Sequence, residues 1–306
     1  MNFRTEIQIK KSQEKICHKQ KILLLGSCFA QNMQVKFAEG GFEAMHPFGA
    51  IYNPYSVANS FKLISVKQMP SAENLFFQKE KWNSYAFHSS YSSADKNEAI
   101  CQMSEAITNA NDILNSNNPI IIVTLGTSWV YELNETGEIV ANCHHSSASS
   151  FTRRAMDVEE IIEVLTPICQ TGKHIIFTVS PVRHLKDGAH ENQLSKSRLL
   201  LAVDKLVAQH PNCEYFPSYE IVLDELRDYR FFAEDMAHPT SLAVDYIWEK
   251  FSSAYFSEKT IDGIREYEKI IKTEKHRPSN PESTEYLLLL EKIKNNKINW
   301  TKKFKS

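Results

Sequence analysis

Short runs of consecutive apolar residues alternate along the chain with longer stretches in which apolar positions return every three or four residues. The short runs lie at 21–25, 119–125, 174–179 and 213–216. A run that is apolar at every position suits a strand buried on both faces of a parallel sheet. The longer stretches predict helices at 30–39, 97–114, 158–170, 191–209 and 241–256. Strands that alternate with helices predict a three-layer α/β/α sandwich with a central parallel sheet.

Two regions depart from this alternation. Residues 128–142 alternate apolar and polar positions around Thr136-Gly137, which predicts a β-hairpin. Residues 40–95 are rich in aromatic residues, Asn and Ser, and we expect long irregular loops over the sheet edge. Arg153 and Arg154 are expected to open the next helix, in a solvated or loop-bracing role.

The composition changes after Phe256. Residues 257–306 are rich in Lys and Glu, and an apolar face that follows Pro281 predicts a packed terminal helix. The basic end, 297–306, is interpreted as a solvated or frayed tail, with a partner-binding tail as the alternative. We therefore expect one α/β domain over 1–256 and a helical extension over 257–306.

Size and charge narrow the class of protein. With 306 residues, 42% of them apolar, the chain can bury a sizeable core. A formal net charge of -2 gives no bias toward nucleic acid or an anionic membrane. The first residues lack the apolar segment of a secretory signal, and no run approaches the roughly 18 apolar residues of a membrane helix. We expect a cytoplasmic protein with no nucleic-acid partner and no membrane contact.

Motifs for bound cofactors are missing from the sequence. The six cysteines form no C-x-x-C pair, and His144 and His145 are adjacent with no matching carboxylate spacing, so no metal site is predicted. The chain has neither G-x-G-x-x-G nor G-x-x-x-x-G-K-[ST]. We expect no cofactor.

The first predicted strand ends abruptly at Gly26, and Ser27 follows where the chain turns into a helix. Ligands of open α/β sheets bind beyond the carboxyl ends of the strands. Free N–H groups at a helix start can stabilise an oxyanion, so Ser27 could be an attacking hydroxyl. Alternatively it caps the helix. The adjacent Cys28 is expected to point into the sheet–helix interface as a packing residue.

A second polar pair precedes the helix predicted at 241–256. Asp235 and His238 are three residues apart, which lets the carboxylate fold back onto the imidazole Nδ1 and leaves Nε2 free to face a serine. Pro239 stiffens the exit from this loop. A purely structural histidine is the alternative.

Several blocks of the sequence carry a family resemblance. The stretch "GSCFA" at Gly26–Ala30 resembles the defining motif of the GSCFA family, a branch of the SGNH (GDSL-like) hydrolases, whose late D-x-x-H motif is matched by "DMAH" at Asp235–His238. The blocks "HPFGAIYNP" (46–54), "LGTSWVY" (125–131) and "SPVRHLKDGAHENQLSK" (180–196) also resemble family blocks, in the right order. The resemblance covers about residues 20–255.

This resemblance implies an α/β/α fold and a catalytic triad. Ser27 would be the nucleophile, His238 its base and Asp235 the group that orients the base. The oxyanion hole of the superfamily uses the backbone N–H of the serine, here Ser27, and a glycine N–H, for which Gly49 is the best match.

The third oxyanion donor departs from the superfamily pattern. An asparagine is expected in a G-x-N motif, but the sequence has Ser128 at that position, and Asn142 after the hairpin is the possible substitute. Loss of one such donor costs about 100- to 1000-fold in rate. This departure weakens the expectation of ordinary esterase activity.

Two further polar residues are expected near the same sheet edge. Arg183 follows the strand predicted at 174–179 and could bind a substrate anion or fix the loop 181–192 through a salt bridge. His46 could line the site beside Gly49 or serve a structural role.

The resemblance implies cleavage of a carboxylic ester through an acyl-enzyme, with a small-molecule or carbohydrate ester such as an O-acetyl sugar as substrate. An acyltransferase with the same triad is the first alternative. A non-catalytic binding protein on the same fold is the second.

Overall fold

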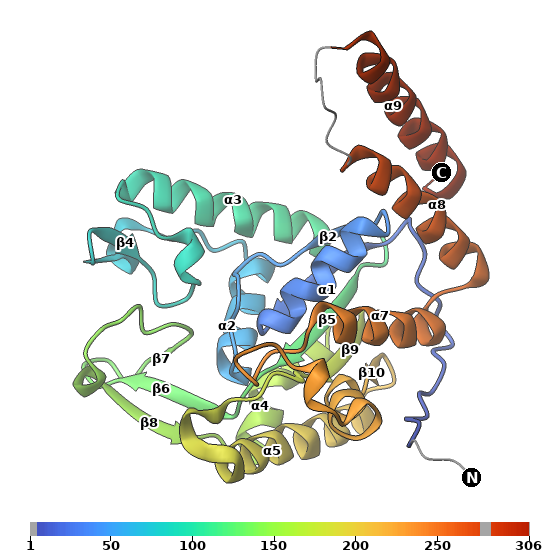
Figure 1. The fold of residues 1–306 in the computed structure, drawn as a ribbon. Coiled ribbons are helices and arrows are strands. Elements are labelled where there is room, and N and C mark those ends of the chain that lie inside the picture. Colours follow the sequence, from blue (N-terminus) through green and yellow to red (C-terminus); the bar gives the residue numbers. More distant parts are fainter. Residues whose placement is uncertain (1–4, 276–282, 306) are drawn as a thin grey trace.

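Five parallel strands form the central sheet, as the apolar runs predict. In the computed structural model, which describes residues 5–275 and 283–305, their order is β10-β9-β5-β1-β2 (Figure 1). The strands are β1 (Lys21–Gly26), β2 (Glu43–Met45), β5 (Ile120–Leu125), β9 (His174–Val179) and β10 (Cys213–Tyr215). All residues of β5 and β9 are buried, as expected for strands covered on both faces.

The order of the strands reverses between β1 and β5. The chain first adds β2 on one side of β1 and then returns to add β5, β9 and β10 on the other side. At such a point the connections leave in opposite directions, and a crevice opens outside the carboxyl ends of the two strands. Gly26 at the end of β1 pairs with Thr124 of β5, so the segments that follow these residues start side by side.

Helices cover both faces of the sheet, and the three-layer prediction is therefore confirmed (Figure 1). Leu23 and Leu25 of β1 pack into one core with the helices α2 to α5, whereas Ile22 and Leu24 pack into the other core with α1 and α7. The helices are α1 (Cys28–Glu39), α2 (Pro54–Ser65), α3 (Lys96–Leu114), α4 (Val158–Cys169), α5 (Gly188–Gln209) and α7 (Ser241–Tyr255). In the described part of the chain, no helix combines the length and the hydropathy that crossing a bilayer requires.

The expectation of irregular structure over residues 40–95 is wrong in part. This region contains β2, the two-stranded pair β3 (Phe76–Gln78) and β4 (Lys81–Asn83), and the twelve-residue helix α2. Asn53 caps α2, since its Oδ1 accepts a hydrogen bond from the Ser56 N–H at 2.8 Å. Pro54 occupies the first turn, where a missing N–H costs nothing.

The predicted hairpin forms from β6 (Trp129–Leu133) and β7 (Ile139–Val140), which pair antiparallel. A third strand, β8 (Phe151–Ala155), pairs with the other edge of β6. Arg153 and Arg154 therefore lie in a strand and do not open a helix, which corrects the prediction. The helix α4 starts only after Asp157, whose Oδ1 accepts from the Glu160 N–H at 2.8 Å.

Two helices, α8 (Glu258–Glu274) and α9 (Thr284–Phe304), form the C-terminal extension (Figure 1). The basic end is not frayed up to Phe304, because it is helical and because Trp300 and Phe304 are only 3% and 7% exposed, whereas Lys302 and Lys303 are solvated as expected. The Trp300 Nε1 donates to the Gly263 carbonyl at 2.8 Å. Pro281 lies outside the described residues.

Between α5 and α7, a short helical segment comprises α6 (Ser218–Glu220) and the turn Ile221–Leu226.

Candidate functional site

Ser27 lies at the predicted turn between β1 and α1, where its N–H donates one hydrogen bond and its Oγ accepts another. Its N–H donates to the Thr124 carbonyl at 3.0 Å, and its Oγ accepts from the Phe29 N–H at 3.3 Å. Only 1% of Ser27 is exposed. Gly26 allows this turn with φ +127°, where a Cβ would lie 2.0 Å from the Thr124 oxygen. The alternative that Ser27 caps the helix is thus confirmed, and its N–H does not point to an oxyanion hole.

Cys28 is the first residue of α1 and is partly exposed. It belongs to neither of the two cores, so the expectation of a packing residue in the interface is wrong. Burial raises the pKa of its thiol, while the N–H groups of Cys28 and Phe29 and the ammonium of Lys196 act in the opposite direction. The Asp235 carboxylate adds a smaller upward effect. The thiol is therefore within electrostatic reach of both Lys196 and Asp235.

Asp235 and His238 make the contact that their spacing predicts. Oδ2 of Asp235 lies 2.6 Å from Nδ1 of His238, and Oδ1 accepts from the N–H groups of Ala237 and His238 at 2.9 and 3.0 Å. These hydrogen bonds, those from the backbone first, lower the pKa of Asp235 to about 2. Nε2 of His238 has no hydrogen-bond partner among residues 5–275 and 283–305, and the side chain is 49% exposed. The ring nitrogen that a base would use therefore remains available.

The loop that carries this pair is fixed to the segment after β9. The Arg183 N–H donates to the Ala237 carbonyl at 3.0 Å, and its guanidinium lies 3.9 Å from the centre of the Phe232 ring. Phe232 in turn pairs with Pro239 in an antiparallel bridge. These contacts give Arg183 a loop-bracing position. Binding of a substrate anion by Arg183 stays a prediction.

His46 supports the turn before Ser27. Its Nε2 lies 3.1 Å from the Gly26 carbonyl, which also accepts from the Ile51 N–H at 2.9 Å. Burial lowers the pKa of His46 to about 4, so the imidazole is neutral near pH 7 and donates from Nε2. This geometry matches the structural role, and a contact between His46 and substrate stays a prediction.

The segment after His46 also reaches β5. The Tyr52 carbonyl accepts from the N–H groups of Gly126 and Thr127 at 2.8 and 3.0 Å. Gly49 lies in this segment with φ +67°, where a Cβ would meet the His88 side chain at 2.5 Å. No described residue accepts a hydrogen bond from the Gly49 N–H. Gly49 therefore keeps a free N–H near the ends of β1 and β5, as the oxyanion prediction requires.

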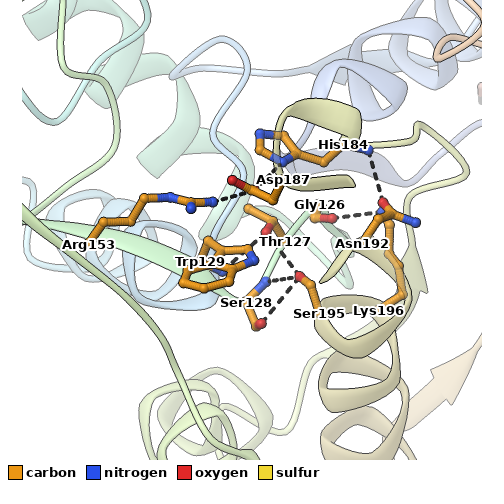
Figure 2. Close-up of polar contacts among 10 residues, drawn as sticks. All are labelled: Gly126, Thr127, Ser128, Trp129, Arg153, His184, Asp187, Asn192, Ser195 and Lys196. Carbon is orange, nitrogen blue, oxygen red and sulfur yellow. Dashed lines mark hydrogen bonds and ion pairs between the residues drawn. The ribbon is translucent and has the colours of Figure 1, made fainter. Parts of the chain in front are cut away.

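Ser128 does not offer its hydroxyl to the surface. The residue is fully buried, and its Oγ donates to the Ser195 Oγ at 3.2 Å (Figure 2). The Ser195 Oγ also accepts from the Ser128 N–H at 2.8 Å and lies 3.0 Å from the Thr127 Oγ1. This placement argues against Ser128 as an oxyanion donor and assigns it to the anchoring of the β5–β6 connection on α5.

Lys196, which is not among the predicted site residues, lies beside this anchor (Figure 2). The side chain is 1% exposed, and its Nζ donates to the carbonyls of Gly126 and Ser180 at 2.7 Å each. Burial lowers the pKa of Lys196 to about 7, and Cys28 has an opposing effect. One signal for it exists in the sequence: Lys196 falls on the buried face of α5 with Leu199 and Val203.

Asn142 lies in a different neighbourhood. Its Oδ1 accepts from the His144 N–H at 2.9 Å, and its N–H donates to the Tyr85 carbonyl at 3.3 Å. None of its hydrogen bonds involves another predicted site residue, so its role as a substitute oxyanion donor stays a prediction.

The His144 Nε2 lies 2.7 Å from the Ser84 carbonyl. In the part of the chain that the structure describes, no three His, Cys, Asp or Glu side chains converge as metal ligands.

Arg153 lies beside the same β5–β6 connection. Its guanidinium stacks 4.0 Å from the centre of the Trp129 ring and forms an ion pair with Asp187. The Nδ1 of His184 lies 3.1 Å from the same Asp187 carboxylate (Figure 2). These contacts link the hairpin to the loop between β9 and α5, and they support the loop-bracing role expected of Arg153.

A cavity of about 560 Å³ lies between α2, the β3–β4 pair and the β6–β7 hairpin. Its lining includes Tyr55, Lys62, Glu73 and Tyr85, but none of the predicted site residues. The predicted chemistry is therefore at the carboxyl edge of the sheet and outside this cavity.

Comparison with known proteins places the chain in a family. The model described as the GSCFA family matches residues 21–251, which is more than half of the 306 residues. No curated protein and no solved structure matches the chain. The matched range contains the turn at Ser27 and Cys28 as well as the Asp235–His238 pair, and the chain belongs to the GSCFA family.

Proposed function

We propose that this protein is an acyl hydrolase of the SGNH type that cleaves a carboxylic ester through a covalent acyl-enzyme. The observation that carries the proposal is the Asp235–His238 pair, with 2.6 Å between Oδ2 and Nδ1 and an unused Nε2. A carboxylate in this position holds the imidazole in the tautomer that can accept a proton at Nε2. His238 then acts as general base and afterwards as general acid.

The position of the β1–α1 turn in the sheet supports the same chemistry. The sheet reverses between β1 and β5, and the first turn of α1 follows β1 at this point. The N–H groups of a helix start, together with the free Gly49 N–H, are suited to an oxyanion. Two nucleophiles lie here, Ser27 as the cap of α1 and Cys28 in its first turn, and the reaction needs one of them.

The substrate is proposed to carry a small acyl group, such as an acetyl ester of a sugar. This part of the proposal rests on analogy with the superfamily that the "GSCFA" motif resembles. An acyltransferase uses the same residues with an alcohol in place of water, so the two reactions differ in the acceptor.

Ester hydrolysis by purified variants tests the proposal. We expect wild type to release p-nitrophenol from p-nitrophenyl acetate and acetate from peracetylated sugars. His238→Ala removes the base and should lower kcat by about 10²- to 10⁴-fold. Asp235→Asn keeps an oxygen for the two backbone N–H groups but turns an amide donor toward Nδ1, which favours the wrong tautomer and should also lower kcat.

His210→Ala is the matched control. His210 precedes β10, at the opposite edge of the sheet, and its loss should leave kcat unchanged. Equal rates for wild type and His238→Ala on every ester of the panel would contradict the proposed function.

A further inference from the structure

We propose that Cys28, and not Ser27, is the nucleophile of this site. The inference rests on the proposed acyl-transfer function and changes the residue that carries the acyl group. Ser27 is 1% exposed, its N–H is bonded to the Thr124 carbonyl, and its Oγ caps α1. A hydroxyl in this position would have to leave the helix cap and reach the surface before it could attack.

Cys28 has the access that Ser27 lacks. It is partly exposed, whereas the next two residues of α1, Phe29 and Ala30, are fully buried in the core. The first turn of α1 therefore directs its packing residues inward and leaves the Cys28 side chain at the carboxyl edge of the sheet. No described residue forms a hydrogen bond or a disulfide with its thiol through a side chain.

Charged and polar groups from three parts of the fold act on the thiol. Asp235 contributes from the loop before α7, Lys196 from α5, and the N–H groups of Cys28 and Phe29 from α1 itself. Burial, and to a smaller extent Cys28, raises the pKa of Tyr52, which lies in the segment after β2. The Arg183 N–H, in the segment after β9, donates to the Ala237 carbonyl at 3.0 Å, so the loop of His238 lies at the same carboxyl edge of the sheet as Cys28.

This environment suits a Cys28 thiol that is activated by a base. Burial raises the pKa of Cys28, so the resting side chain is protonated and weakly nucleophilic. The Lys196 ammonium and the first-turn N–H groups stabilise the negative charge that forms when the proton leaves. The thiol therefore depends on His238 in the same way as a catalytic serine depends on its histidine.

The ester is cleaved in two steps, acylation of Cys28 and hydrolysis of the thioester. His238 Nε2 takes the proton of the Cys28 thiol while the sulfur forms a bond to the ester carbonyl carbon. The C–O bond to the alcohol then breaks, and His238 returns the proton to the leaving oxygen. Water then attacks the carbonyl carbon of the thioester and gives one proton to His238. The C–S bond breaks, and the leaving sulfur takes that proton back. The net reaction is hydrolysis of the ester to an acid and an alcohol.

Trapping the acyl-enzyme distinguishes the two nucleophiles. The full-length protein is mixed with p-nitrophenyl acetate, quenched in acid, digested and mapped by mass spectrometry. We expect one acetyl group on Cys28, which neutral hydroxylamine removes because it is a thioester. The exposed thiol of Cys101 on α3 serves as an internal reference for unassisted acetylation. His238→Ala should slow acetylation of Cys28 by about 100-fold or more and leave Cys101 unchanged.

Two substitutions complete the test. Cys28→Ala should lower turnover by about 1000-fold or more, while Ser27→Ala loses only a helix cap, about 1 kcal/mol, and should keep turnover within about tenfold. If no acyl-enzyme accumulates, these two rates decide the assignment. An acetyl group on Ser27 that resists hydroxylamine, or full activity of Cys28→Ala, would overturn the assignment to Cys28 and leave the proposed function standing. Turnover that neither substitution nor His238→Ala affects would overturn both.

Discussion

The side-chain amine of Lys196 is buried inside the protein, and two backbone carbonyls are its hydrogen-bond partners. These carbonyls, of Gly126 and Ser180, directly follow the neighbouring strands β5 and β9, so the side chain joins the two strand ends beneath the proposed site. A buried carbonyl that loses its only donor costs about 1–3 kcal/mol. Lys196 therefore fixes the backbone at the sheet edge that carries the proposed nucleophile and base.

The low pKa of Lys196 gives a stability prediction with a definite sign. In the unfolded chain a lysine keeps its proton up to about pH 10, whereas burial lowers the pKa in the folded protein to about 7. Between these values the unfolded state binds more protons, so the free energy of unfolding should rise with pH. Urea unfolding at pH 7 and pH 9.5 should show this rise in wild type and a smaller rise in Lys196→Met. The same pH dependence in both proteins would contradict the buried position.

The site contacts that could be predicted join residues that lie close together in the sequence. The Asp235–His238 contact follows from a spacing of three residues. The environment of Cys28 depends instead on Lys196 and Asp235, which are 168 and 207 positions away, so no local pattern reveals which of two adjacent nucleophiles faces the site.

At the scale of elements, the loop before α7 is held by one neighbouring segment. Arg183 contacts it twice, through its N–H on the Ala237 carbonyl and through its guanidinium on the Phe232 ring. Cation–π contacts of this kind contribute about 0.5–2 kcal/mol. The side chain therefore biases the loop toward the arrangement that presents His238.

Arg183→Ala keeps the backbone hydrogen bond and removes the ring contact. If Arg183 positions the loop, kcat should fall by about 2- to 30-fold while KM for neutral esters stays the same. Arg183→Lys should recover part of the loss, and Arg230→Ala, an exposed arginine of the same loop, should have no effect. A rise in KM for anionic esters alone would instead assign Arg183 to substrate binding.

Elements were predicted well where a local pattern defines them. The apolar runs identify the central strands because a strand covered on both faces is apolar at every position. The helix α2 was missed although Asn53-Pro54 is a helix-start signature, because the aromatic residues around it obscured the helical period. Strand β8 was missed because its pairing with β6 joins positions about twenty residues apart.

At the scale of the whole molecule, the C-terminal helices pack at the end of α1 that lies away from the site. Trp300 of α9 contacts Gly41 just after α1, and its ring also packs against His18. A twelve-residue helix is about 18 Å long, which separates this contact from Cys28. The extension therefore supports the fold and leaves the proposed site uncovered at this end.

Trp300→Ala tests that separation. Loss of a buried Trp side chain should lower the free energy of unfolding by about 3–5 kcal/mol. Hydrogen exchange should show faster exchange in α8 and α9, with ester hydrolysis within about twofold of wild type. Leu288→Ala, in the same helix but 62% exposed, should change neither. Loss of activity in Trp300→Ala with an intact α/β domain would show that the extension contributes to the site.

The most direct test of the central claim is a double-mutant cycle between nucleophile and base. Steady-state ester hydrolysis is measured for wild type, Cys28→Ala, His238→Ala and the double variant. Residues that act as one catalytic unit lose their joint effect when either is removed, so the double variant should be no slower than the slower single variant. If the two losses multiply instead, Cys28 and His238 act independently, and they do not form the acyl-transfer centre proposed here.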